Sequence, residues 1–389
     1  MKFRKVGLLS VGHLFTDINQ GAIPALLPFF IIEYHLSYAA AASVVFAANI
    51  ASSLIQPLFG ILTDRMSRPW LMPVGILLAG AGIGFSGWTD NYSIILVMVA
   101  ISGIGVAAFH PEAAKMANRL SQSSKATGLS IFAVGGNAGF AFGPLLATGA
   151  LLQWGAKGTL VFLIPSVITA AVIYWQFKDA ADQQQGQQTV MKDDDEGQPK
   201  PDRWMPFLRL SGVVVARSVL FFGLSTFIPL YWINVLHEPA ALGAAAVTIL
   251  FTCGIFATLI GGRLADKYGH RRVIIGGWTL LIPLIFLLTY FKSTFAATAL
   301  LLPISLGLFS IYGPMMVTGQ NYLPNRVGFA SGVTIGLAVT IGGITAPLLG
   351  WIADIAGVQT ALQILVVIPI LAVGLALTLP KEQQEQTAA

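Results

Sequence analysis

Charged residues and cysteine are scarce in this chain. Of its 389 residues, 55% are hydrophobic and only 10% are charged, against about 25% charged in an ordinary soluble domain. This composition argues against a water-soluble globule. The one cysteine, Cys253, leaves no partner for an intrachain disulfide, and its apolar neighbours predict a small buried hydrophobic residue.

The few charges are clustered, so long uncharged runs separate them. A helix needs about 20 apolar residues to cross a bilayer, and that length is reached at 34–63, 69–89, 91–111, 126–156, 158–177, 239–262, 273–291, 293–325, 327–353 and 355–380. Two more spans, near 6–32 and 204–236, reach it if a charge or two is tolerated inside. Continuous apolar runs indicate helices and not barrel strands. We therefore expect an all-α membrane protein with twelve transmembrane helices.

The basic residues predict the orientation of these helices. The formal net charge is +5, and 19 of the 22 Lys and Arg residues fall in terminal segments or in the loops of one side. Positive charge marks the cytoplasmic side, so both termini are expected in the cytoplasm, in a multi-pass protein of the cell membrane. We interpret the first span as retained and not as a signal peptide. The basic balance thus reports topology, and no nucleic-acid partner is expected.

The chain repeats itself on either side of a polar segment. Residues 179–203 contain Gln, Pro and an acidic run, and predict a flexible cytoplasmic linker. Landmarks recur across it at offsets of 201 to 203 residues: Pro28 and Pro229, 60–65 and 262–267, Pro111 and Pro314, 143–146 and 346–349. The repeat predicts two pseudo-symmetric six-helix bundles, 1–178 and 204–380, followed by a tail, 381–389. Two parallel repeats of this kind are typical of transporters whose site lies between the halves.

Ionisable residues inside spans are the first candidates for function, because a charge in a bilayer is costly. At 1.5 Å per residue, Asp17 and Arg217 lie near half depth of their spans. We expect them to face one cavity and to pair when it is empty; a static ion pair that only fixes packing is the alternative. His13, Asp17 and Gln20 share one helical face. Burial raises the pKa of a carboxylate and a neighbouring positive charge lowers it, so the two effects can place the pKa near the working pH. Asp17 with His13 therefore predicts a proton site.

Further polar residues complete the candidate set. His110 and Glu112 are two residues apart, about 200° around a helix, so one is expected to face the cavity. We favour His110 for the cavity, and Glu112 as a proton carrier or a partner of nearby arginines. An arginine suits a planar oxyanion, and the predicted substrate-binding residues are Arg217, His110, Gln20, Asn137, Tyr231 and Tyr312. Residues expected to latch the inward-closed state are Asp64, Arg65, Arg68, Asp266, Lys267 and Arg271.

Several segments resemble a known family. Residues 60–69 and 262–272 are similar to the cytoplasmic signature of the major facilitator superfamily, and 139–148 is similar to its antiporter motif. Within that superfamily, 13–20, 109–112 and 134–139 resemble the fosmidomycin-resistance type of exporter. The resemblance implies proton-driven efflux of small molecules, antibiotics included. The glycines of 135–143 also recur at three- or four-residue spacing, which predicts close helix packing.

No motif indicates an enzyme. The chain has no glycine-rich nucleotide loop before a lysine, no Cys or His cluster with ligand spacing and no nucleophile elbow. No cofactor or metal is therefore expected, and the predicted partners are lipid, protons and a small-molecule substrate, with the chain acting as a monomer. The predicted function is proton-coupled export of a small anionic compound. Two alternatives stay open: a proton-coupled importer, and a membrane receptor or scaffold that transports nothing.

Overall fold

All regular structure is helical in the residues that the structure describes. The computed structural model describes 2–34, 38–65, 68–122, 124–178 and 201–381. Within them, the segments long and apolar enough to cross a membrane are Ser43–Arg65, Tyr92–Ser121, Lys125–Phe177, Trp204–Asn234, Ala245–Tyr268, His270–Tyr290, Thr294–Tyr322 and Val358–Leu377. The predicted all-helical fold is confirmed. The count of twelve spans and the cytoplasmic termini stay predictions, and most of the predicted linker lies outside the described residues.

The chain divides into two compact units. The first unit comprises Met1–Gln122, Ile131–Asp202 and Leu323–Thr340; the second comprises Ser123–Ser130, Arg203–Tyr322 and Ile341–Ala389. The units therefore follow the two sequence halves except at 123–130 and 323–340, which each join the unit of the other half. The predicted bundle boundaries stay predictions.

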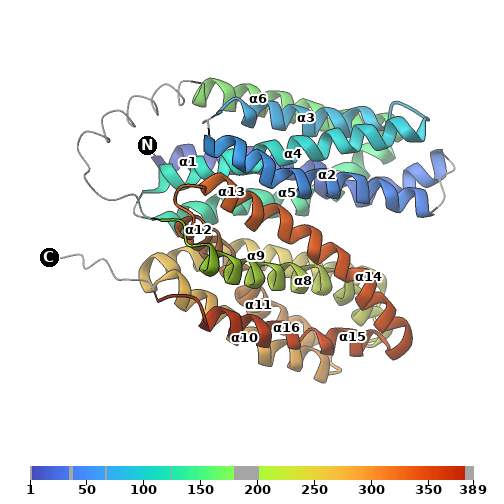
Figure 1. The fold of residues 1–389 in the computed structure, drawn as a ribbon. Helices are drawn as coiled ribbons and strands as arrows, with labels where there is room; N and C mark the ends of the chain where they lie inside the picture. The colour runs from blue at the N-terminus through green and yellow to red at the C-terminus, as the bar shows by residue number, and fades with distance from the viewer. Residues whose placement is uncertain (1, 35–37, 66–67, 123, 179–200, 382–389) are drawn as a thin grey trace, which may run out of the picture. The chain divides into compact units, whose positions relative to one another are not determined.

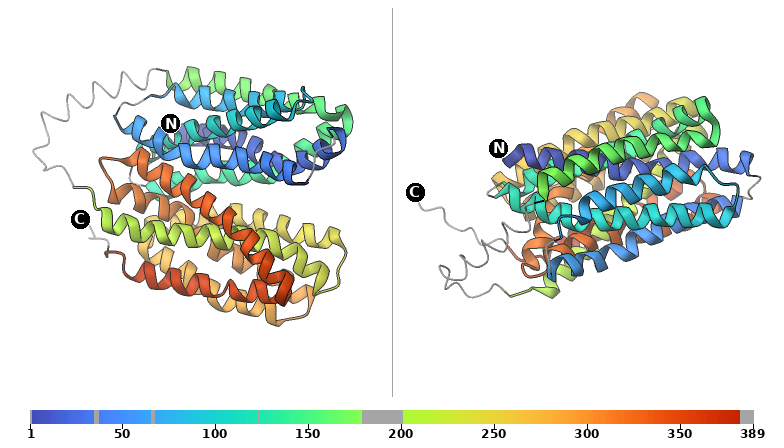
Figure 2. Two further views of the ribbon diagram at one scale, coloured as in Figure 1. Left: turned by 45° about the vertical axis from the view of Figure 1, so that its right-hand side comes forward. Right: turned by 90° about the horizontal axis from the view of Figure 1, so that it is seen from above.

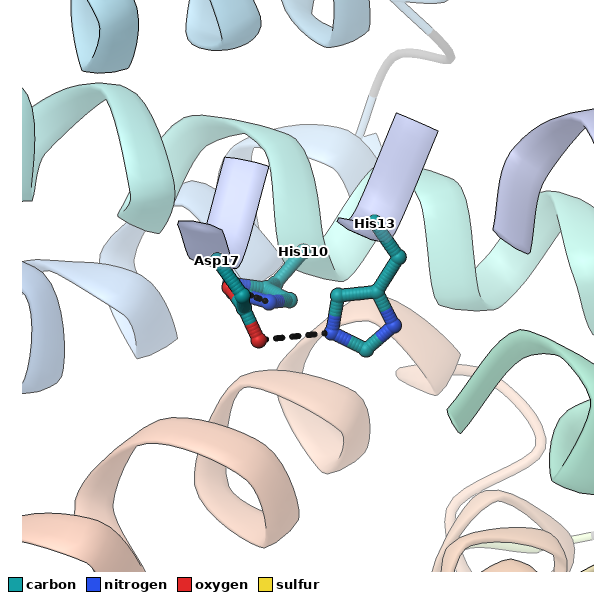
Figure 3. A group of neighbouring side chains, drawn as sticks. All are labelled: His13, Asp17 and His110. Atoms are coloured by element: carbon teal, nitrogen blue, oxygen red, sulfur yellow. Dashed lines mark ion pairs between the residues drawn. The ribbon is translucent and has the colours of Figure 1, made fainter. Parts of the chain in front are cut away.

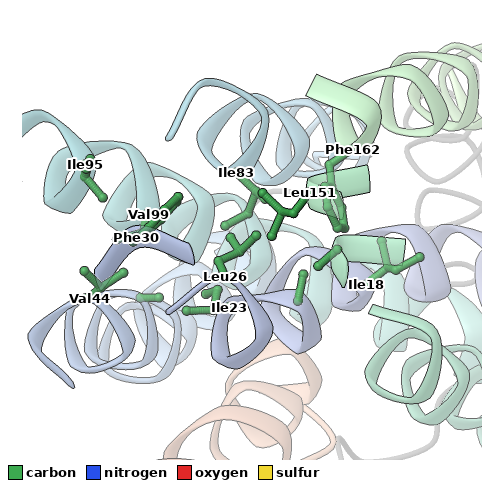
Figure 4. Close-up of a cluster of buried hydrophobic side chains, with 13 residues drawn as sticks. Ile18, Ile23, Leu26, Phe30, Val44, Ile83, Ile95, Val99, Leu151 and Phe162 are labelled. Carbon is green, nitrogen blue, oxygen red and sulfur yellow. The ribbon is translucent and has the colours of Figure 1, made fainter. Parts of the chain in front are cut away.

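Helices α1 to α6 form most of the first unit. Their bounds are α1 Lys2–Glu33, α2 Tyr38–Arg65, α3 Leu71–Ser86, α4 Tyr92–Ser121, α5 Lys125–Trp154, the 3-10 segment η1 Gly155–Phe162, and α6 Leu163–Phe177. Helix α3 lies beside α4 and α6 (Figures 1 and 2). Apolar side chains of α1, α3, α4 and η1, among them Phe30, Ile83, Val99 and Phe162, are fully buried together (Figure 4). Their burial stabilises the unit around α1.

Glycines of α5 bring its backbone against α1. A Cβ atom at Gly135 would lie 1.9 Å from the carbonyl oxygen of Ser10, and one at Gly143 would lie 2.6 Å from that of Ile18. Any larger side chain would separate the two helices. The close packing predicted at these glycines is confirmed, and it presses α5 onto the face of α1 that carries Asp17.

The second half of the chain continues as α8 Trp204–Asn234, α9 Ala240–Tyr268, α10 His270–Tyr290, α11 Thr294–Ser310, α12 Tyr312–Tyr322, α13 Val327–Gly332, the π-helical segment η2 Val333–Leu337, α14 Ala338–Ala356, α15 Val358–Ile364 and α16 Val367–Leu377. Two uncharged runs are each broken into two helices, at Ile311 and at Leu365–Val366. Pro314 and Pro369 explain the breaks, because neither has the N–H that would bond to the carbonyl four residues earlier, and both lie in the first turn of the new helix.

Candidate functional site

Two histidines share the carboxylate of Asp17. Nε2 of His13 lies 3.1 Å from Oδ2 of Asp17, and Nε2 of His110 lies 3.1 Å from Oδ1 (Figure 3). His13 and Asp17 come from successive turns of α1, whereas His110 comes from α4. All three residues are at least 95% buried. The structure therefore brings His110, predicted to bind substrate, to the predicted proton site.

The second ring nitrogen of each histidine contacts a helix carbonyl. Nδ1 of His13 lies 2.8 Å from the carbonyl oxygen of Phe132, and Nδ1 of His110 lies 2.9 Å from that of Val106. The His13 ring also stacks on the Phe132 ring, with centroids 4.2 Å apart, and meets the His110 ring edge to face at 4.7 Å. These contacts fix the direction in which both Nε2 atoms point.

Gly136 of α5 closes the site. A Cβ atom there would lie 2.5 Å from Nε2 of His13 and 2.8 Å from Oδ2 of Asp17. One at Gly139 would lie 2.9 Å from Cβ of Asp17. The glycine spacing predicted helix packing only, so the role of Gly136 in admitting the imidazole and carboxylate is a residue-level feature that the sequence analysis missed.

The three side chains have the composition of a metal site. One ligand atom from each of His13, Asp17 and His110 lies within 4.8 Å of the others, and two imidazoles with a carboxylate suit a divalent transition metal. The spacing along the sequence did not indicate this set because His110 is almost a hundred residues away. We interpret the set as a proton site, since a separation of 3.1 Å between nitrogen and oxygen is the distance of an ion pair between an imidazolium and a carboxylate.

Gln20 and Asn137 lie in the first unit with this group. Nε2 of Gln20 donates to Oδ1 of Asn49 at 3.0 Å and to Oγ of Ser52 at 3.1 Å, so it links α1 to α2. Asn137 is half-buried on α5, next in sequence to Gly136. Their predicted contact with substrate stays a prediction.

Arg217 is held against aromatic rings in the second unit. Its Nε donates to the carbonyl oxygen of Leu308 at 3.2 Å, and its Cζ lies 4.3 Å from the ring centroid of Tyr312. Phe221 and Phe309 lie farther away, at 5.7 and 5.9 Å. Among the described residues, no ion pair with Arg217 is found. The predicted pairing with Asp17 would join residues of different units and stays a prediction.

Tyr231 occupies the packed interior of the second unit. The side chain is fully buried, and its hydroxyl donates to the carbonyl oxygen of Thr289 at 3.4 Å. This contact ties α8 to α10. Tyr312, the other tyrosine predicted to bind substrate, lies beside Arg217. The predicted contact of both tyrosines with substrate stays a prediction.

Asp64 and Asp266 each bind the start of a helix from the other half of the sequence. Asp64 accepts hydrogen bonds from the backbone N–H groups of Gly328 and Phe329, at 2.6 and 2.8 Å. Asp266 accepts them from Ala126 and Thr127, at 3.0 and 2.9 Å. Both acids, and both pairs of amides, are related by the same offset of 202 residues. The repeat in the sequence therefore recurs in the hydrogen bonds, at helix N-termini that favour negative charge.

The basic residues near these acids have different surroundings. Arg271 donates to the carbonyl oxygens of Leu377 and Leu379 at the end of α16, while Lys267 lies over the ring of Tyr268.

Arg65 is exposed and Arg68 is half-buried. Arg65 lines a polar pocket of about 290 Å³ with, among others, Asp64, Asp202, Asn325 and Arg326.

Glu112 lies apart from the Asp17 group despite its nearness to His110 in sequence. Its side chain is buried and interacts electrostatically with Lys115 and Arg119. Lys115 is buried too, and its Nζ donates to the carbonyl oxygen of Thr63. Of the two roles left open for Glu112, these neighbours favour a partner of basic residues at the end of α4.

The chain is similar to known proteins over most of its length. A family model described as Major Facilitator Superfamily matches residues 9–347. The chain is 30% identical over 380 residues to the fosmidomycin resistance protein of Escherichia coli, covering 95% of this chain and 91% of that protein. It is 28% identical to an uncharacterized transporter of the same superfamily, YfnC of Bacillus subtilis, covering 97% and 93%.

Solved structures show the same fold. The crystal structure of FucP, a transporter of the superfamily captured in the outward conformation, superposes with a TM-score of 0.75 at 15% sequence identity and covers 98% of this chain and all of that one.

Proposed function

Because the chain belongs to the Major Facilitator Superfamily, we propose that it is a secondary transporter that exports a small anionic compound in exchange for protons. The observation that carries the proposal is the buried contact of His13, Asp17 and His110. Three titratable groups with no other titratable neighbour among the described residues of their unit are costly in a membrane helix bundle, and buried groups of this kind mark proton relays in transporters.

The direction of transport is proposed from the relative in Escherichia coli. That protein is named for resistance to fosmidomycin, and resistance follows when a transporter removes a compound from the cell. Fosmidomycin is a phosphonate, so a phosphonate antibiotic is the kind of cargo we propose. An importer would use the same fold, and the direction of flux in oriented vesicles separates the two.

Arg217 is the proposed contact for the anionic head of the cargo. Its Nε is fixed by the carbonyl of Leu308, and Tyr312 lies against the guanidinium. An arginine fixed at Nε presents its two terminal nitrogens together, in a geometry that matches two oxygens of a phosphonate or carboxylate. Cargo at Arg217 and protons at Asp17 then bind in different conformations of one transport cycle.

Asp64 and Asp266 are proposed to stabilise one of those conformations. Each carboxylate contacts a helix start from the other half of the sequence, so a motion that carries this helix start away from the acid has to break these hydrogen bonds. The contacts bias the equilibrium toward the state that contains them.

The substitution Asp17→Asn tests proton coupling. We expect it to abolish uphill export of fosmidomycin into inside-out vesicles under a pH gradient, because an amide lacks the negative charge that stabilises a proton on the neighbouring imidazoles. Asp354→Asn, which changes an exposed acid of α14, is the control. Uphill export by Asp17→Asn at the control rate would refute the coupling role, and gradient-driven uptake of fosmidomycin by the unmodified protein in the opposite direction would favour the importer.

The substitution Arg217→Lys tests the contact with cargo. We expect half-saturation for anionic cargo to rise roughly tenfold, the loss of one charge-assisted hydrogen bond, with a smaller change for a neutral cargo. Arg209→Lys is the matched control on the same helix, since Arg209 is exposed and bonds to the carbonyl of Thr378. Equal effects on anionic and neutral cargo would assign Arg217 to packing instead.

A further inference from the structure

The two imidazoles at Asp17 are arranged alike, although they come from different helices. Each presents Nε2 to its own oxygen of the carboxylate, at the same distance of 3.1 Å (Figure 3). Each also presents Nδ1 to a helix carbonyl, at 2.8 Å for His13 and 2.9 Å for His110. The sequence analysis assigned a proton role to His13 and a substrate role to His110, so this equivalence is new information.

The carbonyl contacts determine the tautomers. A carbonyl oxygen can only accept a hydrogen bond, so Nδ1 of both rings must be the donor. A neutral imidazole carries a single N–H, which Nδ1 already uses. In the neutral ring, Nε2 then faces the carboxylate with a lone pair. Each contact with Asp17 becomes attractive only when Nε2 also binds a proton. The carboxylate therefore has two proton positions, one toward His13 and one toward His110.

Both contacts with Asp17 are ion pairs. In the position toward His110, Oδ1 of Asp17 and Nε2 of His110 are both buried, and neither atom has a hydrogen-bond partner among the described residues. Buried polar atoms without partners are rare and mark sites of function or strain. A proton held between these two atoms would give both of them a partner.

The net charge of the group depends on how many of the two positions hold a proton. With two protons, one carboxylate and two imidazolium rings give a net charge of +1. With one proton the group is neutral, and with none it carries −1. Within the first unit, the described titratable groups that act on Asp17 are His13 on its own helix and His110 on α4. Helix α5 presents Gly136 and Gly139 there, and no titratable group.

We propose that His13, Asp17 and His110 form a two-proton store, in which His110 holds the second exchangeable proton. This inference rests on the proposed proton-coupled function. It adds that the transporter exchanges two protons for each cargo molecule. Each proton moves between Nε2 of one histidine and water when a conformational change opens the group, and no other bond is formed or broken.

Nitrogen-15 NMR of histidine-labelled full-length protein in lipid nanodiscs tests the store without any cargo. We expect the rings of His13 and His110, assigned through His13→Gln and His110→Gln, to keep Nδ1–H at every pH while both Nε2 atoms gain a proton on acidification. His270→Gln is the control that removes an imidazole elsewhere. A ring that carries its single proton on Nε2, or titration of one ring only, would overturn the two-proton store.

The ratio of protons to cargo gives the second measurement. In vesicles loaded with a pH dye and supplied with fosmidomycin, we expect two protons per molecule exported by the unmodified protein and by His270→Gln, and one for His110→Gln. A ratio of one in the unmodified protein would overturn the inference while leaving proton coupling intact. Two titrating rings without proton-driven export would instead leave the store intact and refute the proposed function.

Discussion

At the scale of single residues, the absence of a side chain at Gly136 is as important as the charges beside it. A methyl group there would lie within 2.5 to 2.8 Å of His13 and Asp17, so Gly136→Ala has to displace one of them. A displacement of about 1 Å in a reacting group costs up to a hundredfold in rate, and we expect uphill export by Gly136→Ala to fall at least tenfold. The measurement is the initial rate of export in vesicles at matched protein amounts.

Gly149→Ala is the matched control, because a Cβ atom at Gly149 of the same helix has nothing within 4 Å. It changes the same residue type in the same helix without touching His13. Export by Gly136→Ala at the rate of this control would mean that α5 gives way at no cost and does not fix the geometry of the proton site.

Part of this site could be predicted from the sequence. The spacing of His13 and Asp17 predicts that they share one helical face, and in the structure Nε2 of His13 lies 3.1 Å from Oδ2 of Asp17. The contribution of His110 could not be derived in this way, because helical spacing says nothing about which face of α4 meets α1. Nor does any sequence signal indicate that the carbonyls of Phe132 and Val106 fix both tautomers, since every residue has a carbonyl.

At the scale of secondary-structure elements, charge-free runs predict where helices exist but not where they end. The run 91–111 belongs to α4, which continues to Ser121 through buried Glu112 and Lys115. Counting charges fails here because these side chains have polar partners, such as the carbonyl of Thr63 for Lys115. The runs 293–325 and 355–380 fail in the opposite sense, since each contains two helices and a proline lies in the first turn of the second one.

Asp64 and Asp266 stabilise the helix starts that they contact. Asn has one acceptor oxygen and no charge, so Asp64→Asn loses one of two hydrogen bonds and the attraction to the helix dipole. We expect the helix start to be destabilised by about 1 to 2 kcal/mol. We expect hydrogen exchange at the amides of Gly328 and Phe329 to become roughly 5- to 30-fold faster. Asp266→Asn should do the same to the amides of Ala126 and Thr127.

Each substitution also serves as the control for the other. If the two contacts are equivalent by the repeat, the accelerated amides should lie 202 residues apart in the two variants, with Asp354→Asn affecting neither pair. Unchanged exchange in either variant would mean that the carboxylate oxygens do not protect these amides in the membrane.

At the scale of the whole molecule, export in exchange for protons requires reciprocal linkage between the two ligands. If binding of an anion expels protons from the group at Asp17, acidification must weaken binding of that anion by the same free energy. The sign follows from mass action: low pH fills the proton positions, and the filled form binds cargo poorly. For each proton expelled, the dissociation constant rises tenfold per unit fall in pH.

We therefore expect the dissociation constant of fosmidomycin, measured by calorimetry on protein in nanodiscs, to rise between roughly tenfold and a hundredfold per pH unit over the range in which the protons titrate. Asp17→Asn should remove this dependence, apart from that of the phosphonate itself, which the variant thereby measures. Arg217→Lys should raise every dissociation constant without changing the slope, because it alters the cargo contact and not the proton positions. A slope unaffected by Asp17→Asn would place the expelled protons elsewhere in the chain and leave the buried histidines without a part in coupling.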